Sequence, residues 1–169
     1  MSYIITPSSS GWGNWQDHLA RAKLHIRGKE QQSLFEEVMQ KNAYQGDLNE
    51  VCFDLMNPCY SDCPAEYFYR AFYEEYETLH PLIVLAACAA WEGQIPAENF
   101  NVASPHLLAD EKGKDFILLL QHRGEGGNIL SLIPTDMWVQ RPGYFVGISS
   151  SSYQYKRYDY AHNSKRISL

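Results

Sequence analysis

The chain has 169 residues, of which 45% are hydrophobic and 14% aromatic, and its net charge is −6. This length fits a single domain with a sizeable core, which excludes a globally disordered chain. The longest strongly apolar run, residues 82–91, is about half of the ~20 residues needed to cross a bilayer, and residues 1–7 lack the features of a secretory signal. We therefore expect a soluble cytoplasmic protein that does not bind membranes.

The first part of the chain predicts helices. Residues 1–13 have the composition of an irregular lead-in, and Asn14 is a favourable N-cap for a helix that Gly28 ends. Apolar side chains at helical spacing predict a second helix over residues 31–44. Both helices have one apolar face, so we expect them to pack on a core.

Three further helices are predicted before residue 96. A capping-box pattern begins the third, over residues 47–56. The fourth, over residues 62–79, has Pro64 in its first turn, where no backbone N–H is needed. The fifth, over residues 81–92, is apolar on every side. We expect the fifth helix to be the buried core helix.

The remainder of the chain predicts strands. Residues 97–114 form a long polar connection, and the apolar run within residues 115–121 predicts a central strand. The glycine-rich segment 123–127 is typical of a hairpin loop. The later strands are expected over residues 128–133, 137–139, 144–149 and 153–160.

The predicted fold is α+β. An N-terminal half of about five helices, residues 1–96, packs on a C-terminal antiparallel meander of four to five strands, residues 115–169. Residues 97–114 connect the two halves, and all 169 residues form one domain.

Charge is distributed unevenly along the chain. Residues 46–111 carry twelve carboxylates against a single basic side chain, Arg70. Such a field attracts basic surfaces and repels phosphate backbones over about one Debye length, ~8 Å. Residues 153–160 interleave tyrosines with bases as single-strand nucleic-acid platforms do, but the acidic chain argues against nucleic acid. The alternative, that acidic faces only confer solubility, stays open.

The acidic segment predicts a protein-binding surface. Tyrosine supplies contact area at low entropy cost, and carboxylates steer association. Small acidic α+β proteins that neutralise a basic enzyme, such as bacterial toxin-immunity proteins, have this general character. We therefore expect a module that docks on a basic protein, such as a toxin or nuclease, and needs no cofactor. The expected binding residues are Tyr69, Arg70, Tyr73, Glu74, Glu75 and Glu77, with Asp54 nearby.

Thiol chemistry is the alternative hypothesis. Cys63 is expected at the N-terminus of the fourth helix, where the helix dipole stabilises a thiolate. The pair Asp62-Cys63 resembles the Asp-Cys opening of papain-like thiol hydrolases, although Pro64-Ala65 replaces their usual Ser-Gly. The resemblance implies a thiol-dependent hydrolase or transferase in which His122, at a later strand end, serves as the base.

The other cysteines have simpler interpretations. Cys52 and Cys88 fit small core hydrophobes. A zinc site using Cys52, Cys59, Cys63 and His80 matches none of the usual ligand spacings, so we expect no metal. A disulfide between Cys59 and Cys63 stays open.

The remaining histidines show no metal pattern either. His18 and His25 are expected on one helix, beyond the four-residue spacing of a two-histidine metal site, and partly exposed. His80 precedes Pro81 and fits a helix junction, while His106 falls in the polar connection.

Overall fold

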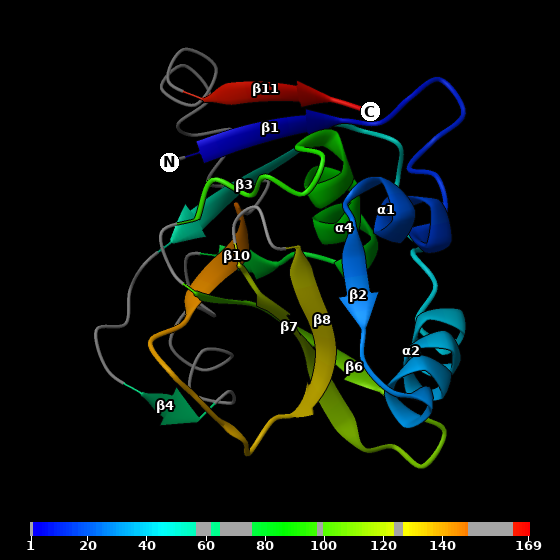
Figure 1. Ribbon diagram of the computed structural model, residues 1–169. Helices are drawn as coiled ribbons and strands as arrows, with labels where there is room; N and C mark the ends of the chain where they lie inside the picture. The colour runs from blue at the N-terminus through cyan, green and yellow to red at the C-terminus, as the bar shows by residue number, and fades with distance from the viewer. Residues whose placement is uncertain (1, 57–61, 65–75, 98–99, 124–126, 149–163) are drawn as a thin grey trace.

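The computed structural model describes residues 2–56, 62–64, 76–97, 100–123, 127–148 and 164–169. Of these residues, 41% lie in strands and 23% in helices, so a sheet dominates the fold (Figure 1). The helices are α1 (Trp15–Arg21), α2 (Lys29–Lys41) and α4 (Pro81–Ala90). The strands are β1 (Ser2–Thr6), β2 (Leu24–Ile26), β3 (Val51–Met56), β4 (Cys63–Pro64), β5 (Tyr76–Thr78), β6 (Asn101–Ala109), β7 (Asp115–Gln121), β8 (Asn128–Pro134), β9 (Trp138–Val139), β10 (Gly143–Ile148) and β11 (Lys165–Ser168).

Nine of the described strands form one mixed sheet. Its order is β11-β1-β3-β10-β6-β7-β8-β2, and β5 pairs with β10 beside this path. The pairs β1–β11, β10–β6 and β2–β8 are parallel, and the others are antiparallel. The short strands β4 and β9 pair with each other outside the large sheet.

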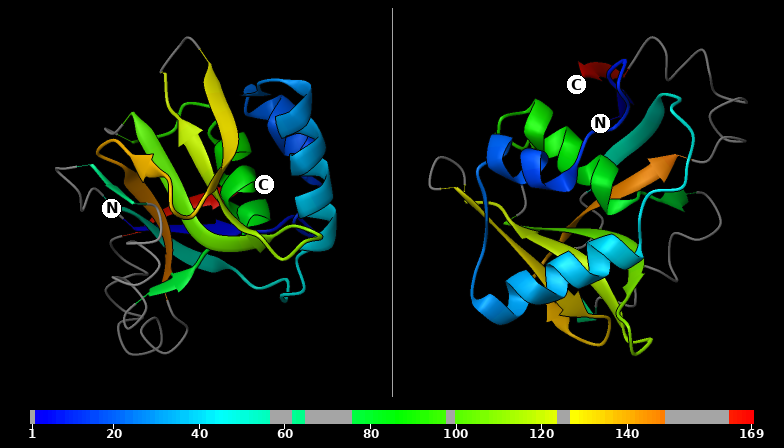
Figure 2. Two further views of the ribbon diagram at one scale, coloured as in Figure 1. Left: turned by 90° about the horizontal axis from the view of Figure 1, so that it is seen from below. Right: turned by 90° about the vertical axis from the view of Figure 1, so that its right-hand side faces the viewer.

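The three described helices lie on one side of the sheet (Figure 2). Helix α4 contacts α1, β6 and β11, while α2 packs on β6 and β8. Leu85, Ala86 and Ala87 of α4 are fully buried, as an all-apolar helix requires. The other face of the sheet has a smaller apolar cluster that includes Ile117 and Tyr144.

The predicted fold, a five-helix N-terminal half on a C-terminal antiparallel meander of four to five strands, is wrong, because the described residues form three helices and a mixed sheet of nine strands that includes β1, β2 and β3 from the N-terminal part. The segment expected as the third helix is strand β3, which lies between β1 and β10. Its apolar positions fit a helix stripe and a buried strand equally well, so the local pattern cannot decide. The segment forms a strand because it pairs with β1 on one edge and with β10 on the other, and Phe53 is completely buried there.

Two further differences lie near the N-terminus. The expected irregular lead-in contains β1, in which Tyr3, Ile4 and Ile5 are buried. The first helix ends at Arg21 instead of reaching Gly28, because the chain turns and forms β2. Asn14 caps this helix as expected, since its side chain accepts the Asp17 N–H at 2.9 Å.

The expected polar connection over residues 97–114 is also wrong, because it contains the nine-residue strand β6. Pro105 is unusual inside a strand, since proline cannot donate to a ladder. The pairing of β6 with β7 shifts register between Ser104 and Leu108, which is a bulge-like irregularity. Pro105 lies within this irregularity, so no ladder hydrogen bond depends on it.

Other predicted elements agree with the structure. Helices α2 and α4 and strands β7, β8 and β10 lie where local patterns place them, within a few residues. Most of the expected fourth helix lies outside the described residues, and its described ends form β4 and β5. The strand expected over residues 153–160 also lies outside them.

Candidate functional site

Two of the expected binding residues are described by the structure. Glu77 is exposed on β5, and Asp54 is half-buried on β3. Both strands pair with β10, where Gly147 is the partner of Glu77 and Val146 the partner of Asp54. Successive residues of a strand point to opposite faces, so the two carboxylates are not on one face. The other expected residues, Tyr69, Arg70, Tyr73, Glu74 and Glu75, lie outside the described residues.

Glu77 lines a pocket of about 390 Å³, within the usual range for binding sites. Residues 43–46, in the loop after α2, form one wall of the pocket opposite residues of β5. None of the described residues that line the pocket is a lysine or an arginine. The lining side chains that matter chemically are Tyr44, Cys52, Glu77, Thr78, His80 and His106.

His80 is fixed at the N-terminus of α4. Its Nδ1 accepts the Leu82 N–H at 3.1 Å, and its Nε2–H donates to the Asn42 carbonyl oxygen at 2.8 Å. Because one nitrogen accepts and the other donates, the ring is held as a single neutral tautomer. Burial lowers the pKa of His80, in agreement with this assignment. The expected helix junction at His80 is confirmed.

His106 is presented by the irregular part of β6 that follows Pro105, a position at which a bulge re-aims a side chain. Its Nδ1 lies 2.8 Å from Thr78 Oγ1, and its ring centroid lies 5.1 Å from that of His80. Burial, reinforced by His80, lowers the pKa of His106 to about 4. Both imidazoles are therefore neutral at pH 7.

Tyr44 extends the two histidines into a row of three rings. Its ring centroid lies 5.3 Å from that of His80, and its hydroxyl donates to the Asp47 carbonyl oxygen at 3.2 Å. Burial and the Asp47 carboxylate raise the pKa of Tyr44, so the phenol also stays neutral. The pocket thus combines neutral aromatic walls with the carboxylate of Glu77, a combination that suits a cation.

Cys63 and Pro64 are extended and pair with Val139 and Trp138. Residues 65–75, where the expected helix would continue, lie outside the described residues, so the stabilisation of the Cys63 thiolate by a helix dipole stays a prediction. His122 lies beside β8, where its Nδ1–H donates to Asn128 Oδ1 at 3.0 Å.

The buried thiols are expected to be unreactive. Burial, with a contribution from Asp54, raises the pKa of Cys52 to about 12, and burial does the same for Cys88. At pH 8 we expect both to react with iodoacetamide roughly a thousandfold more slowly than in the unfolded chain. Mass spectrometry of alkylated peptides measures both rates, and equal rates in native and unfolded protein would contradict the assignment. Selective, fast alkylation of Cys63 would support the thiol hypothesis.

Two further expectations concern metals and membranes. Within the part of the chain that the structure describes, no group of three His, Cys, Asp or Glu side chains is placed to hold a metal ion. Cys59 and the side chain of Cys63 lie outside that part. None of the described helices has the length and apolar character needed to span a bilayer.

The sequence patterns missed most of this pocket. Only Glu77 was expected at a binding site, because its charge belongs to the acidic segment. The signals that could have found His80 and His106 are their positions beside Pro81 and Pro105, where proline fixes the backbone. His18, expected to be partly exposed, is 3% exposed, and its Nε2–H donates to the Trp12 carbonyl oxygen.

Comparison of the chain with protein-family models, with curated protein sequences and with solved structures finds no match.

Proposed function

We propose that this protein is an acidic binding module that docks on a basic protein partner and neutralises it, in the manner of toxin-immunity proteins. The observation that carries the proposal is the exposed carboxylate of Glu77 at a pocket whose described lining contains no lysine or arginine. An exposed carboxylate beside which none of the described lining residues is a lysine or an arginine attracts positive charge from a partner.

The loop between α2 and β3 supports the same proposal. Residues 45–50 are all exposed, and Leu48, at 62% exposure, stands between Asp47 and Glu50. Glu50 pairs with Arg166 at 3.2 Å, so part of the charge is compensated within the protein. An apolar side chain flanked by carboxylates suits a patch in which apolar contact holds the partner and charge steers it.

Charge reversal at Glu77 should slow docking. The measurement is surface plasmon resonance with the basic protein that copurifies with this chain from its host. We expect Glu77→Lys to lower the association rate about tenfold at low salt, because the steering charge changes sign. Raising the salt to about 300 mM should lower the wild-type rate by a similar factor, since it shortens the Debye length.

Glu92→Lys is the matched control for this experiment. Glu92 is also exposed but follows the C-terminal end of α4, whereas the pocket lies at its N-terminal end. The two ends of this helix are about 15 Å apart, beyond one Debye length at physiological salt. If the association rate changes neither with the salt concentration nor in Glu77→Lys, this acidic surface is excluded as the docking site.

A further inference from the structure

We infer that the pocket between His80, His106 and Glu77 is an anchor site for one arginine side chain of the basic partner. The inference rests on the proposed function and deepens it, because it names the group that enters the protein and the place where it binds.

The walls of the pocket include three neutral rings. Both nitrogens of His80 are engaged with the backbone, and its ring packs against those of Tyr44 and His106 in T-shaped contacts. The hydroxyl of Tyr44 is directed at the Asp47 carbonyl oxygen, so the three rings contribute aromatic surface more than free polar atoms to the lining. A guanidinium group is planar and weakly hydrated, and it stacks on aromatic faces better than an ammonium group does.

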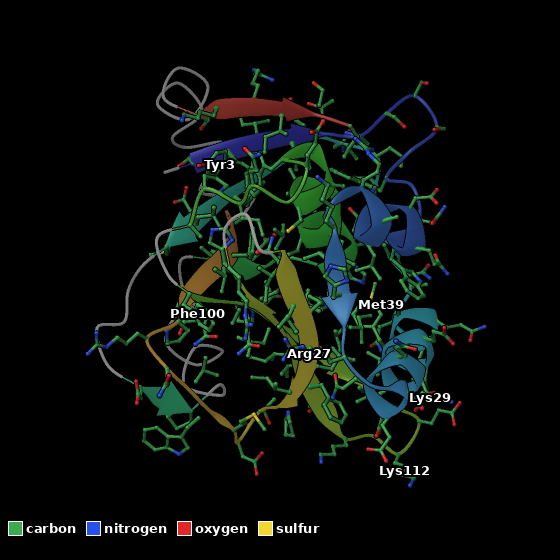
Figure 3. The ribbon with its side chains drawn as sticks, viewed as in Figure 1. Tyr3, Arg27, Lys29, Met39, Phe100 and Lys112 are labelled. Carbon is green, nitrogen blue, oxygen red and sulfur yellow. The ribbon has the colours of Figure 1, made fainter. Side chains whose placement is uncertain are left out.

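The charge of the pocket selects a cation. Glu77 supplies a carboxylate, and no described lining residue is basic. Arg27 and Lys29 lie at the start of α2 (Figure 3), whereas the pocket lies beyond the other end of this helix. Lys41, at that other end, donates to the Asp110 carbonyl oxygen in the β6–β7 turn. A carboxylate accepts two parallel N–H groups from a guanidinium, which an ammonium group cannot offer.

The shape of the pocket suits a long side chain with a polar end. Leu79 and Ile83, each 3% exposed, contribute apolar surface to its lining, and Val51 lies beside them. The methylene stem of an arginine can cover such surface while its guanidinium reaches the carboxylate. The volume of about 390 Å³ matches a single side chain better than a folded element of the partner.

The test uses small probes in place of the partner. N-acetyl-arginine amide is titrated into the full chain while the histidine ring signals are followed by NMR, with the citrulline derivative as the neutral isostere and the lysine derivative as the second cation. We expect the arginine probe to shift the His80 and His106 signals, with an affinity at least about tenfold above that of citrulline. The lysine probe should bind more weakly than the arginine probe.

Two exposed carboxylates provide the variants. Glu77→Gln keeps the size of the side chain and removes its charge, and we expect it to weaken arginine binding at least about tenfold. Glu92→Gln makes the same change at the far end of α4 and should leave binding unchanged. Equal shifts with arginine and citrulline, or unchanged arginine binding in Glu77→Gln, would overturn the anchor site.

Failure of this inference and failure of the proposed function give different results. Salt-sensitive docking of the basic partner that neither Glu77→Gln nor excess arginine probe weakens overturns the anchor site and leaves the proposed function standing. Specific arginine binding in the pocket, without docking of any basic protein, overturns the proposed function and supports the anchor site as an arginine-binding pocket.

Discussion

Substituting Gly93 with alanine is expected to lower the free energy of unfolding by at least about 3 kcal/mol. Gly93 follows α4 with φ at +81°, a conformation that favours glycine. A Cβ at this position would lie 2.4 Å from the backbone carbonyl oxygen of Ala22, the C-cap of α1. Because the neighbouring atom is backbone, relief requires moving the end of α1 away from α4.

Gly113→Ala is the matched control, since Gly113 has φ at +79° and a Cβ there would meet nothing within 4 Å. The control keeps the backbone strain, about 1–2 kcal/mol, and removes the collision. Urea denaturation of both variants measures the difference. If Gly93→Ala and Gly113→Ala lower the free energy of unfolding equally, backbone conformation alone, and not the close approach of α1, requires glycine at position 93.

Acidification is expected to destabilise the protein through His106 by on the order of 2–3 kcal/mol. In the unfolded chain this histidine takes up a proton near its ordinary pKa of 6.5, whereas burial lowers its pKa in the folded protein to about 4. Between these values the unfolded state binds more protons, so stability rises with pH. The contribution is complete above pH 6.5 and is lost as the pH falls from 6.5 to 4. His80, whose pKa is also lowered, acts in the same direction.

The measurement compares wild type with His106→Gln by urea denaturation at several pH values between 7.5 and 4. Carboxylates and His80 titrate in both proteins, so the change in the stability difference isolates His106. We expect the advantage of the wild type over the variant to shrink by about 2–3 kcal/mol across this range. Parallel stability curves for the two proteins would contradict a neutral His106 in the folded state.

Elements with an unambiguous local signal could be predicted from the sequence. Helix α4 is apolar all round, begins at Pro81 and is followed by Gly93. Its apolar pattern, its start signal and its stop signal therefore all predict the same helix. Strand β7 is a continuous apolar run that ends at a polar residue, and Asn14 is a typical N-cap. In each case neighbouring residues contain the whole signal.

Strands whose partners are remote could not be predicted. Strand β3 has a pattern that fits a helix as well as a strand, and its partners are remote in sequence, with β1 before it and β10 far after it. In β6, Pro105 is tolerated only because the ladder is irregular there, a feature that depends on β7. Local reasoning therefore overestimated the helices and underestimated the sheet.

The site shows the same division. Glu77 could be predicted as a binding residue because the sequence alone shows that it belongs to an acidic segment. The row of three rings could not be predicted, because it depends on hydrogen bonds between residues that are distant in sequence. His80 bonds to Asn42 across 38 residues, and His106 to Thr78 across 28 residues. These contacts exist only once α4, β5 and β6 have assembled.

The parallel pairing of β1 with β11 has a consequence for the order of folding. The pair joins Tyr3 to Lys165, whereas β6, β7 and β8 are consecutive antiparallel neighbours that close short loops. Loop-closure entropy therefore favours early formation of the β6–β7–β8 meander and late completion of the β1 edge. During synthesis, β1 is made before the other described strands. One of its edges stays unpaired until residues 165–168, which form β11, have been added.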